Sequence, residues 1–459
     1  MAQIETDYDW PGQYKPFNHQ KITAAFLTER PRAFCFNEQG TGKTASVIWA
    51  SDYLMNLGLV KRVLIVCPLS IMKSAWQNDL FKFACHRSCD IAYGDKKKRA
   101  KIIGSGAEFI IINFDGLAIV QEEIATGGFD LIVVDEASAY KNVATERWKI
   151  LRDLCQDIKG LWMLTGTPAA QSPVDAYGLA KLINPEGVPK FFGSFRDQVM
   201  YKAGMYRWVP KSNAQDVVHQ ALQPAIRFEK SQCLDLPDVT FVERDAPLTP
   251  QQKKYYQKLK QDMIIQAAGE EISSANAATS INKLLQISGG AVYTDTKEVV
   301  EFDVSNRLQV VKEVIDEASH KVLVFVPFTH TIELLRAYLT KNGITNDTIN
   351  GQVPVGRRNT IIQDFQDTEN IQVLIIQPQA ASHGLTLTAA NVIIWYAPIS
   401  SYETYAQANA RINRPGQVNP MTIVHIKGSP VEDKMYASLY NKGYNHTNLL
   451  DLYRDELAI

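Results

Sequence analysis

Short apolar runs, many rich in β-branched residues, alternate along this chain with segments that have the period of a helix. In the first half, the runs occupy residues 33–36, 61–68, 108–114, 129–136 and 161–168; in the second half, they occupy 321–328, 371–378, 391–398 and 421–428. This alternation is typical of βαβ units, whose parallel strands are buried on both faces. The pattern therefore predicts an α/β fold with two successive parallel sheets.

A more polar stretch, about residues 170–315, separates the two sets of apolar runs. It has few candidate strands and is predicted to be mostly helical. Its clearest helix begins in LTPQQKKYYQKL, with Thr249 as N-cap, Pro250 as the first helical residue and Gln252 closing a capping box. Residues 227–239 are predicted to be an extended connector. We expect domains at 1–235 and 236–459, with a helical segment at about 250–315 opening the second.

Length and charge narrow the class of protein. A chain of 459 residues is longer than one hydrophobic core usually supports, which favours two domains. The 48 Lys+Arg nearly balance the 49 Asp+Glu, which excludes a globally basic nucleic-acid-binding protein but not a local basic groove. The acidic, polar N-terminus does not resemble a signal peptide, and no apolar run reaches the roughly 18 residues of a membrane span. We expect a cytoplasmic protein without a membrane partner.

The cysteines offer one candidate metal cluster, formed by Cys85, His86 and Cys89. Zinc sites usually need a second ligand pair at finger-like spacing, and this cluster has none. An ordinary helix surface is therefore the favoured interpretation, and zinc is the alternative.

The segment NEQGTGKT follows the first apolar run and precedes the helical run ASVIWASDYL. A strand, a glycine-containing loop and a helix N-terminus form the context of a phosphate-binding loop. In such a loop the glycines let backbone N–H groups face the phosphates, the lysine reaches the β- and γ-phosphates, and the hydroxyl holds Mg²⁺. The segment predicts a nucleotide site at Glu38, Gln39, Gly40, Thr41, Gly42, Lys43 and Thr44; a structural turn is the alternative.

A second acidic motif, LIVVDEAS at residues 131–138, is a buried-looking strand that ends in two carboxylates. Asp135 is the natural partner of the nucleotide's Mg²⁺, and Glu136 the natural group to orient and deprotonate the attacking water. Two exposed acids on a turn are the alternative. Together with the glycine-containing loop, the motif predicts an NTPase.

The segment QANARINRPGQ, residues 407–417, follows the strand at 391–398. Ser400 and Glu403 are predicted to form a capping box that starts a helix, and Pro415 to stop it. Residues three and four apart are helix neighbours, so Gln407, Arg411 and Arg414 would share one face. Plain solvated surface is one interpretation. Phosphoryl transfer, however, needs positive charge at the γ-phosphate, which an arginine finger supplies.

The order of the motifs resembles superfamily 2 helicase-like ATPases, most closely the Swi/Snf-type double-stranded DNA translocases. The motifs are PFNHQ, NEQGTGKT, VCPLSIMKSAW, IINFDGL, DEAS followed by KN, LTGTP, KVLVFVPFTHTIELL, ASHGLTLTAANVII and QANARINRPGQ, and they span about residues 14–440. Asn37 departs from the family, which frequently has Asp there. The resemblance implies two tandem RecA-like P-loop domains with a helical insertion between them, in a minimal two-lobe form of bacterial or viral type.

The resemblance also implies site residues, with ATP and Mg²⁺ as cofactors and duplex DNA as partner of a monomer. The catalytic set is Lys43, Asp135, Glu136, Arg411 and Arg414, and the metal set is Thr44 and Asp135. The phosphate-loop residues bind ATP together with Gln20, which would read the adenine edge, Gly384 and Gln407. The DNA track consists of Ser70, Lys73, Phe328, Thr329 and Thr386.

The leading functional hypothesis is an ATP-driven translocase that moves along duplex DNA and remodels DNA structures or DNA–protein complexes. A strand-separating or branch-migration helicase is an alternative, because the same motifs serve both activities. A catalytically silent DNA-binding scaffold is an alternative of another class, disfavoured by the intact Lys43, Asp135 and Glu136. We expect the protein in the cytoplasm of a bacterial cell or a virus-infected host.

Overall fold

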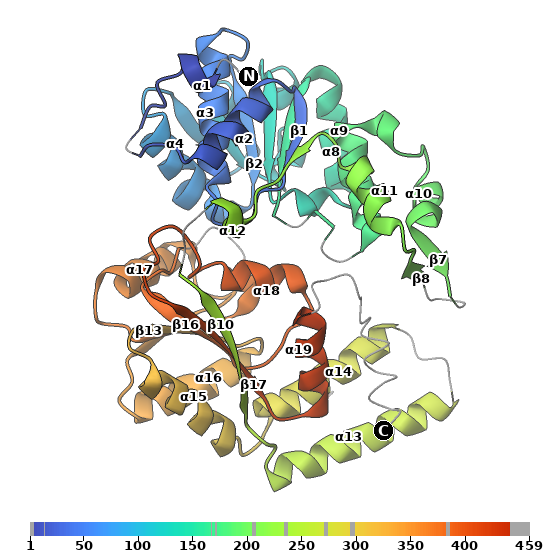
Figure 1. Ribbon diagram of the computed structural model, residues 1–459, viewed down its shortest axis with the longest axis vertical. Helices are drawn as coiled ribbons and strands as arrows, with labels where there is room; N and C mark the ends of the chain where they lie inside the picture. The colour runs from blue at the N-terminus through green and yellow to red at the C-terminus, as the bar shows by residue number, and fades with distance from the viewer. Residues whose placement is uncertain are drawn as a thin grey trace. The chain divides into compact units, whose positions relative to one another are not determined.

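The computed structural model describes residues 4–12, 14–166, 168–169, 172–203, 208–233, 237–269, 274–293, 299–381 and 386–440. The chain forms two compact units, Met1–Asp235 and Leu236–Ile459, and Figure 1 labels their elements. Each unit contains one large parallel sheet. The predicted fold class, α/β with two tandem parallel-sheet domains, is confirmed.

The first unit is built on a seven-stranded parallel sheet with the order β3–β4–β2–β5–β6–β1–β9. The five predicted strands form its middle and are buried at nearly every position because their residues are apolar. The strands are β1 (Arg32–Cys35), β2 (Val63–Cys67), β3 (Cys89–Ala92), β4 (Phe109–Asn113), β5 (Leu131–Asp135), β6 (Gly160–Leu164) and β9 (Ala225–Ile226).

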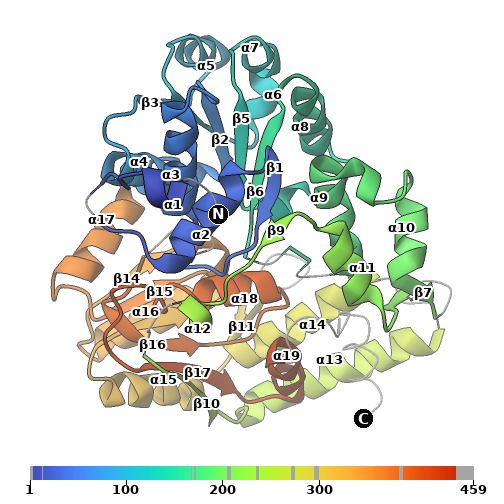
Figure 2. The same ribbon diagram turned by 45° about the horizontal axis from the view of Figure 1, so that its top comes forward.

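Alternate residues of these strands feed two separate hydrophobic cores, one on each face of the sheet. Figure 2 shows helices on both sides of this sheet. One core includes residues of α1 (Ile4–Asp7), α2 (Asn18–Thr28), α3 (Lys43–Asn56) and α4 (Asn78–Phe83). The other includes residues of α5 (Lys96–Ile103), α6 (Gly116–Ile119), α7 (Gln121–Ala125), α8 (Glu146–Asp157), α9 (Ala176–Ile183), α10 (Phe192–Val199) and α11 (Ala214–Ala221).

The second unit is built on a six-stranded parallel sheet with the order β10–β17–β16–β13–β15–β14. Its strands are β10 (Val239–Asp245), β13 (Lys321–Phe325), β14 (Asn346–Ile349), β15 (Val373–Ile376), β16 (Ala390–Trp395) and β17 (Met421–Lys427). Helices α15 (Ser305–Glu317) and α16 (Thr329–Lys341) pack into the core of one face, and α17 (Val355–Asp367) and α18 (Tyr402–Asn409) into that of the other. The four predicted strands of this half are confirmed.

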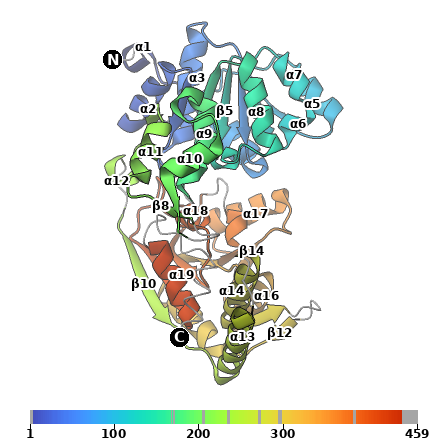
Figure 3. The same cartoon turned by 90° about the vertical axis from the view of Figure 1, so that its right-hand side faces the viewer.

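A helical hairpin follows β10 near the start of the second unit, within the segment expected to be helical. Helices α13 (Pro250–Gly269) and α14 (Ser274–Gly289) lie side by side, as Figure 3 shows. They share a core with the hairpin of β11 (Ala291–Tyr293) and β12 (Val299–Glu301) and with α19 (Pro430–Tyr440). The predicted capping box is confirmed: the Thr249 N–H donates to Gln252 Oε1 at 3.0 Å, and the Gln252 N–H to Thr249 Oγ1 at 3.4 Å.

The strands that were not predicted include β3, β10 and β14, which lie at sheet edges. The extended connector expected at 227–239 was partly wrong, because Lys230–Cys233 forms α12 and Val239 begins β10. An edge strand has only one neighbouring strand, and β10 is half-buried or exposed along its whole length. It therefore lacks the continuous apolar run that marks an interior strand. Within the described ranges, no helix combines the length and the hydropathy needed to cross a membrane.

Candidate ATP site

The phosphate loop joins β1 to α3 and turns at two glycines. Gly40 has φ of +85° and Gly42 of +77°, both in the left-handed region that favours glycine. A Cβ atom at Gly42 would lie 2.1 Å from Nε2 of Gln20. Gly42 is also the N-cap of α3, so the loop delivers the chain to a helix N-terminus, where backbone N–H groups and the helix dipole favour an anion.

Lys43 lies over this loop. Its Nζ donates to the carbonyl oxygens of Asn37 at 2.8 Å and Glu38 at 3.2 Å. Thr41 closes the turn, since its hydroxyl donates to the Glu38 carbonyl oxygen at 2.8 Å. Thr44 follows Lys43 in the first turn of α3. The predicted lysine and hydroxyl are therefore adjacent at the site expected for the phosphates, and their donor groups fit a triphosphate with its metal.

Asp135 ends β5 and is held from two sides. Its Oδ2 accepts the indole N–H of Trp76 at 3.0 Å, and its Oδ1 accepts the N–H of Glu136 at 2.9 Å. Burial raises the pKa of the Asp135 carboxyl, whereas the charge of Lys43 and these two hydrogen bonds act to lower it. Strands β1 and β5 run parallel on either side of β6, so the two predicted motifs, which follow their carboxyl ends, lie at the same edge of the sheet. A bound divalent cation would favour the ionised carboxylate.

Glu136 has backbone strain of the kind that accompanies functional sites. Its φ of +53° and ψ of +54° lie in the left-handed region, which costs a residue with a Cβ about 1–3 kcal/mol. The strain sits at the second of the two predicted carboxylates, between β5 and the short helix Ala137–Tyr140.

Gln20, predicted to read the adenine edge, lies beside the phosphate loop. Its Oε1 accepts the Phe17 N–H at 2.9 Å, and its Nε2 donates to the carbonyl oxygen of Gly42 at 3.4 Å. The neighbouring His19 ring bonds the Thr41 carbonyl oxygen at 2.8 Å through Nε2. The side chain of Gln39 lies against Gly166 of the LTGTP segment. Sequence reasoning missed His19, because a lone histidine in a helix carries no local signal of its partner.

Helix α18 begins one residue later than predicted. Ser401 is the N-cap, and its Oγ accepts the Thr404 N–H at 3.2 Å, so the expected box of Ser400 and Glu403 was wrong. The helix ends at Asn409, before either arginine. The shared helical face of Gln407, Arg411 and Arg414 was therefore also wrong. The Arg411 carbonyl oxygen accepts the N–H of Leu387 at 3.0 Å, which holds the chain in a turn instead of a further helical turn.

The two arginines differ in burial. Arg411 is 1% exposed, whereas Arg414 is half-buried. Arg414 donates from Nε to the Ala410 carbonyl oxygen at 3.0 Å and from Nη1 to the Thr386 hydroxyl at 3.2 Å. A residue predicted for the DNA track is thus bonded to a predicted catalytic arginine. Gln417 also ties this segment to the start of β16, because its Nε2 donates to the Ala390 carbonyl oxygen at 2.8 Å.

We call residues 410–417 the arginine loop. Gln407, on the preceding helix, is 5% exposed and donates to Glu403 Oε1 at 3.4 Å. Gly384, predicted to bind ATP, lies outside the described residues. The segment that follows it, from Thr386 to Ala390, is the one to which the arginine loop is bonded.

The remaining DNA-track residues lie at the starts of helical segments. Ser70 is half-buried in the turn Leu69–Ile71, and Lys73 is exposed in the π-helical turn Met72–Gln77. That turn also carries Trp76, the partner of Asp135. Phe328 is the N-cap of α16 and Thr329 its first residue, both half-buried. Trp76 had no sequence signal as a site residue, because its contact spans 59 positions.

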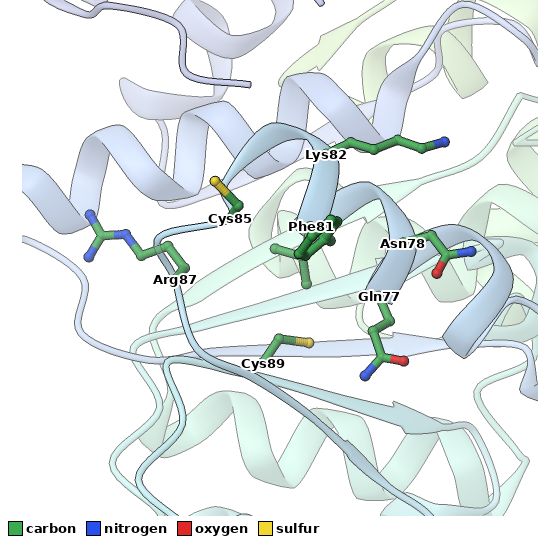
Figure 4. Close-up of a pocket in the computed structure, with 8 residues that line it drawn as sticks. Gln77, Asn78, Phe81, Lys82, Cys85, Arg87 and Cys89 are labelled. Atoms are coloured by element: carbon green, nitrogen blue, oxygen red, sulfur yellow. The ribbon is translucent and has the colours of Figure 1, made fainter. Parts of the chain in front are cut away.

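A pocket of about 570 Å³ lies beside α4, and Figure 4 shows Phe81 at its centre with Cys89 on strand β3. None of the predicted site residues lines it. Cys85 and Cys89 both border this pocket, while the His86 ring bonds Asp52 at 2.8 Å. Among the described residues, no three His, Cys, Asp or Glu side chains are grouped so as to hold a metal ion.

Comparison with known proteins gives matches over most of the chain. Residues 19–289 match the SNF2-related domain, and residues 306–416 match the helicase conserved C-terminal domain. The mouse chromodomain-helicase-DNA-binding protein 1-like is 26% identical over 426 residues, which cover 88% of this chain and 46% of that protein. Putative protein p41 of Acyrthosiphon pisum secondary endosymbiont phage 1 is 22% identical over 459 residues, covering 93% of this chain and 96% of that protein.

Among solved structures, the Sulfolobus solfataricus SWI2/SNF2 ATPase core in complex with dsDNA aligns with a TM-score of 0.47 and 19% identity. The alignment covers 98% of this chain and 97% of that one. The chain spans less than half the length of the mouse relative and nearly the whole length of the phage relative.

Proposed function

This chain belongs to the SNF2-related family, whose domain matches more than half of it, and on that premise we propose that it is a DNA-dependent ATPase. It would couple hydrolysis to movement along duplex DNA and so remodel DNA structures or DNA–protein complexes. The observation that carries the proposal is that Lys43, at the N-terminus of α3, and the half-buried Asp135, at the end of β5, lie at the same edge of the first parallel sheet.

In the first unit, Lys43 and the backbone N–H groups of residues 38–44 would hold the triphosphate. Thr44 and Asp135 would hold Mg²⁺, which neutralises phosphate charge and orients the reacting groups. Glu136 would orient the attacking water and take its proton. Gln20 would read the adenine edge. The positive φ angles of the loop glycines and the donors at the helix N-terminus support this assignment.

In the second unit, we assign the arginine finger to Arg414 and a bracing role to Arg411. Arg414 is half-buried and its hydrogen bonds run to a carbonyl and a hydroxyl, which a phosphate oxygen can replace. Arg411 is almost fully buried, so it is less able to reach a ligand. Gln407 and Gly384 would complete the second unit's share of the ATP site.

Duplex DNA would be held by phosphate contacts that do not depend on base sequence. Ser70 and Lys73 would supply them in the first unit, and Phe328, Thr329 and Thr386 would line the track in the second. We further propose that the protein works as a monomer in the cytoplasm of a bacterial cell or a virus-infected host. The phage relative of nearly equal length supports that setting.

The test is ATP hydrolysis in the presence of duplex DNA, single-stranded DNA or RNA, with Lys43→Ala as the control. Duplex DNA should give the largest stimulation, and Lys43→Ala should remove it, because the ammonium holds the transferred phosphate. An equally low rate with and without DNA would favour a silent scaffold. Stimulation chiefly by RNA would contradict the duplex-DNA proposal.

Translocation and strand separation need a second pair of assays. A motor that tracks along duplex DNA should displace the third strand of a triplex without unwinding a plain fork. Efficient fork unwinding would show that the strand-separating helicase is the better description.

A further inference from the structure

The phosphate loop is hydrogen-bonded to the segment through which the chain leaves the first unit. The N–H groups of Phe36 and Glu38 donate to the carbonyl oxygens of Ile226 and Phe228 at 2.8 and 2.9 Å. In return, the Phe228 N–H donates to Asn37 Oδ1 at 3.0 Å, and the Lys230 N–H donates to Glu38 Oε2 at 3.0 Å. The second unit begins shortly afterwards, at Leu236.

Asn37 and Glu38 therefore contact both the exit segment and Lys43. The side chains of Asn37 and Glu38 hold the segment at 228–230, and their carbonyl oxygens accept the ammonium of Lys43. The Lys43 ammonium has three N–H donors, and these two carbonyls accept from it, so a bound phosphate oxygen would share the ammonium with Asn37 and Glu38. Any change in the loop that follows acts directly on the residues that hold the exit segment.

The orientation of Asn37 is fixed from its other side. Its Nδ2 donates to Thr23 Oγ1 at 2.8 Å, and the Thr23 hydroxyl donates to the His19 carbonyl oxygen at 2.7 Å. Asn37 is 1% exposed and Thr23 is 0% exposed, so water cannot easily replace these bonds. The Asn37 amide thus has one arrangement in which all its partners are satisfied, with Oδ1 towards Phe228.

We propose that Asn37 and Glu38 are positioning residues that couple the phosphate loop to the exit segment, and through it to the placement of the second unit. We call the set Asn37, Glu38, Phe228 and Lys230 the loop latch. The inference goes beyond the proposed hydrolysis, because the latch is assigned to turning the nucleotide state into movement and not to the chemical step. Binding is linked to movement only if the two states differ in contacts, and the latch is the set of contacts that we assign to this difference.

The first test is limited digestion of the full chain with trypsin, followed by the masses of the fragments. Cleavage after Arg227 and Lys230 reports opening of the exit segment. Asn37→Ala should speed this cleavage by about five-fold, the factor that corresponds to loss of one ordinary hydrogen bond. Thr23→Val is the graded variant: it removes the bond that orients the Asn37 amide but keeps the Oδ1 acceptor, so cleavage should accelerate less than in Asn37→Ala. No acceleration in Asn37→Ala, or equal acceleration in both variants, would overturn the latch.

The second test is the amount of triplex strand displaced per ATP hydrolysed. Asn37→Ala should lower this ratio several-fold, and Thr23→Val should lower it less. Asn184→Ala is the control, because it removes a similar side-chain bond to Gly187 outside the latch. A parallel loss of hydrolysis and displacement in Asn37→Ala would mean a merely structural role and would overturn the inference. Absence of DNA-stimulated hydrolysis in the wild type would instead refute the proposed function, and the digestion would still decide the latch.

Discussion

In the first unit the phosphate loop turns at two left-handed glycines, whereas in the second unit the arginine loop turns at one and is tied to a distant segment by the buried side chain of Gln417. Gly40 and Gly42 adopt positive φ angles, and the loop's carbonyl oxygens hold Lys43. The arginine loop has one such glycine, Gly416, and is held both by the main-chain bond from Leu387 to Arg411 and by the side chain of Gln417. The phosphate loop should therefore be disrupted by adding a single Cβ atom at a left-handed glycine. The arginine loop should be disrupted when a side chain that bonds it to a distant segment is removed.

The largest effect that bears on this comparison is expected for Arg414→Ala. Removing an arginine finger should lower DNA-stimulated hydrolysis by about 10³-fold or more, because finger contributions are of that order. ATP binding should change little, since the first unit holds the phosphates; fluorescent nucleotide binding measures it beside turnover. Arg414→Lys keeps the charge but not the planar guanidinium and should recover only part of the rate. Near-normal turnover in Arg414→Ala would show that the arginine loop is ordinary surface.

The next effect tests how strongly the second unit depends on buried side chains. Arg307 on α15 and Glu432 on α19 form an ion pair at 2.8 Å, with side chains 2% and 0% exposed. Arg307→Ala should destabilise the second unit by about 3–5 kcal/mol, because it leaves a buried carboxylate without its partner. Urea denaturation measures the loss. The double variant Arg307→Met with Glu432→Leu should recover most of the stability, and no recovery would contradict this explanation.

Gly42→Ala tests the main-chain side of the comparison. The left-handed backbone costs a Cβ-bearing residue about 1–2 kcal/mol, and the new Cβ would also meet the Gln20 amide. Nucleotide affinity should fall by about ten-fold or more, which corresponds to roughly 1.4 kcal/mol. Gly58→Ala is the matched control: its φ is +70° and nothing lies within 4 Å of the new Cβ. Gly58→Ala should lower stability through the same left-handed backbone but leave nucleotide affinity unchanged. An equal loss of nucleotide affinity in both variants would contradict a specific role for Gly42.

The smallest effect concerns how α18 is held ahead of the arginine loop. The Trp395 indole N–H donates to Asn409 Oδ1 at 2.9 Å, at the last residue of the helix. Trp395→Phe should cost at least the roughly 1 kcal/mol of one hydrogen bond, because it also shrinks a fully buried side chain, and it should slow hydrolysis several-fold. In the first unit, Trp162→Phe removes a bond of equal length to the Arg30 carbonyl oxygen. It should lower stability to a similar degree with little effect on turnover.

The features that the sequence pattern predicted correctly are those whose structure depends on residues close together in the chain. The interior strands are apolar at nearly every position, and the phosphate loop combines glycines, a lysine and a helix start within eight residues. The capping box at Thr249 spans only four residues. Each of these follows from neighbours in the chain, so the interior strands and the capping box agree with the structure.

The parts that could not be predicted depend on partners far along the chain. Whether α18 continues through Arg411 is decided by Leu387, and the orientation of Asp135 is decided by Trp76. Asn37 appeared only as a departure from the family pattern, although its amide joins Thr23 to Phe228. Edge strands such as β10 were not predicted, because a strand with only one neighbour is partly exposed and does not need a continuous apolar sequence.

The position of β10 has a consequence for the order in which the molecule can be made. This strand opens the second unit, yet its neighbour in the sheet is β17, the last strand in the part of the chain that the structure describes. The first sheet is complete once β9 has left the ribosome, so that unit can fold during translation. The second cannot pair β10 with its neighbour until residues 421–427 have emerged, so the edge of β10 stays exposed during that interval.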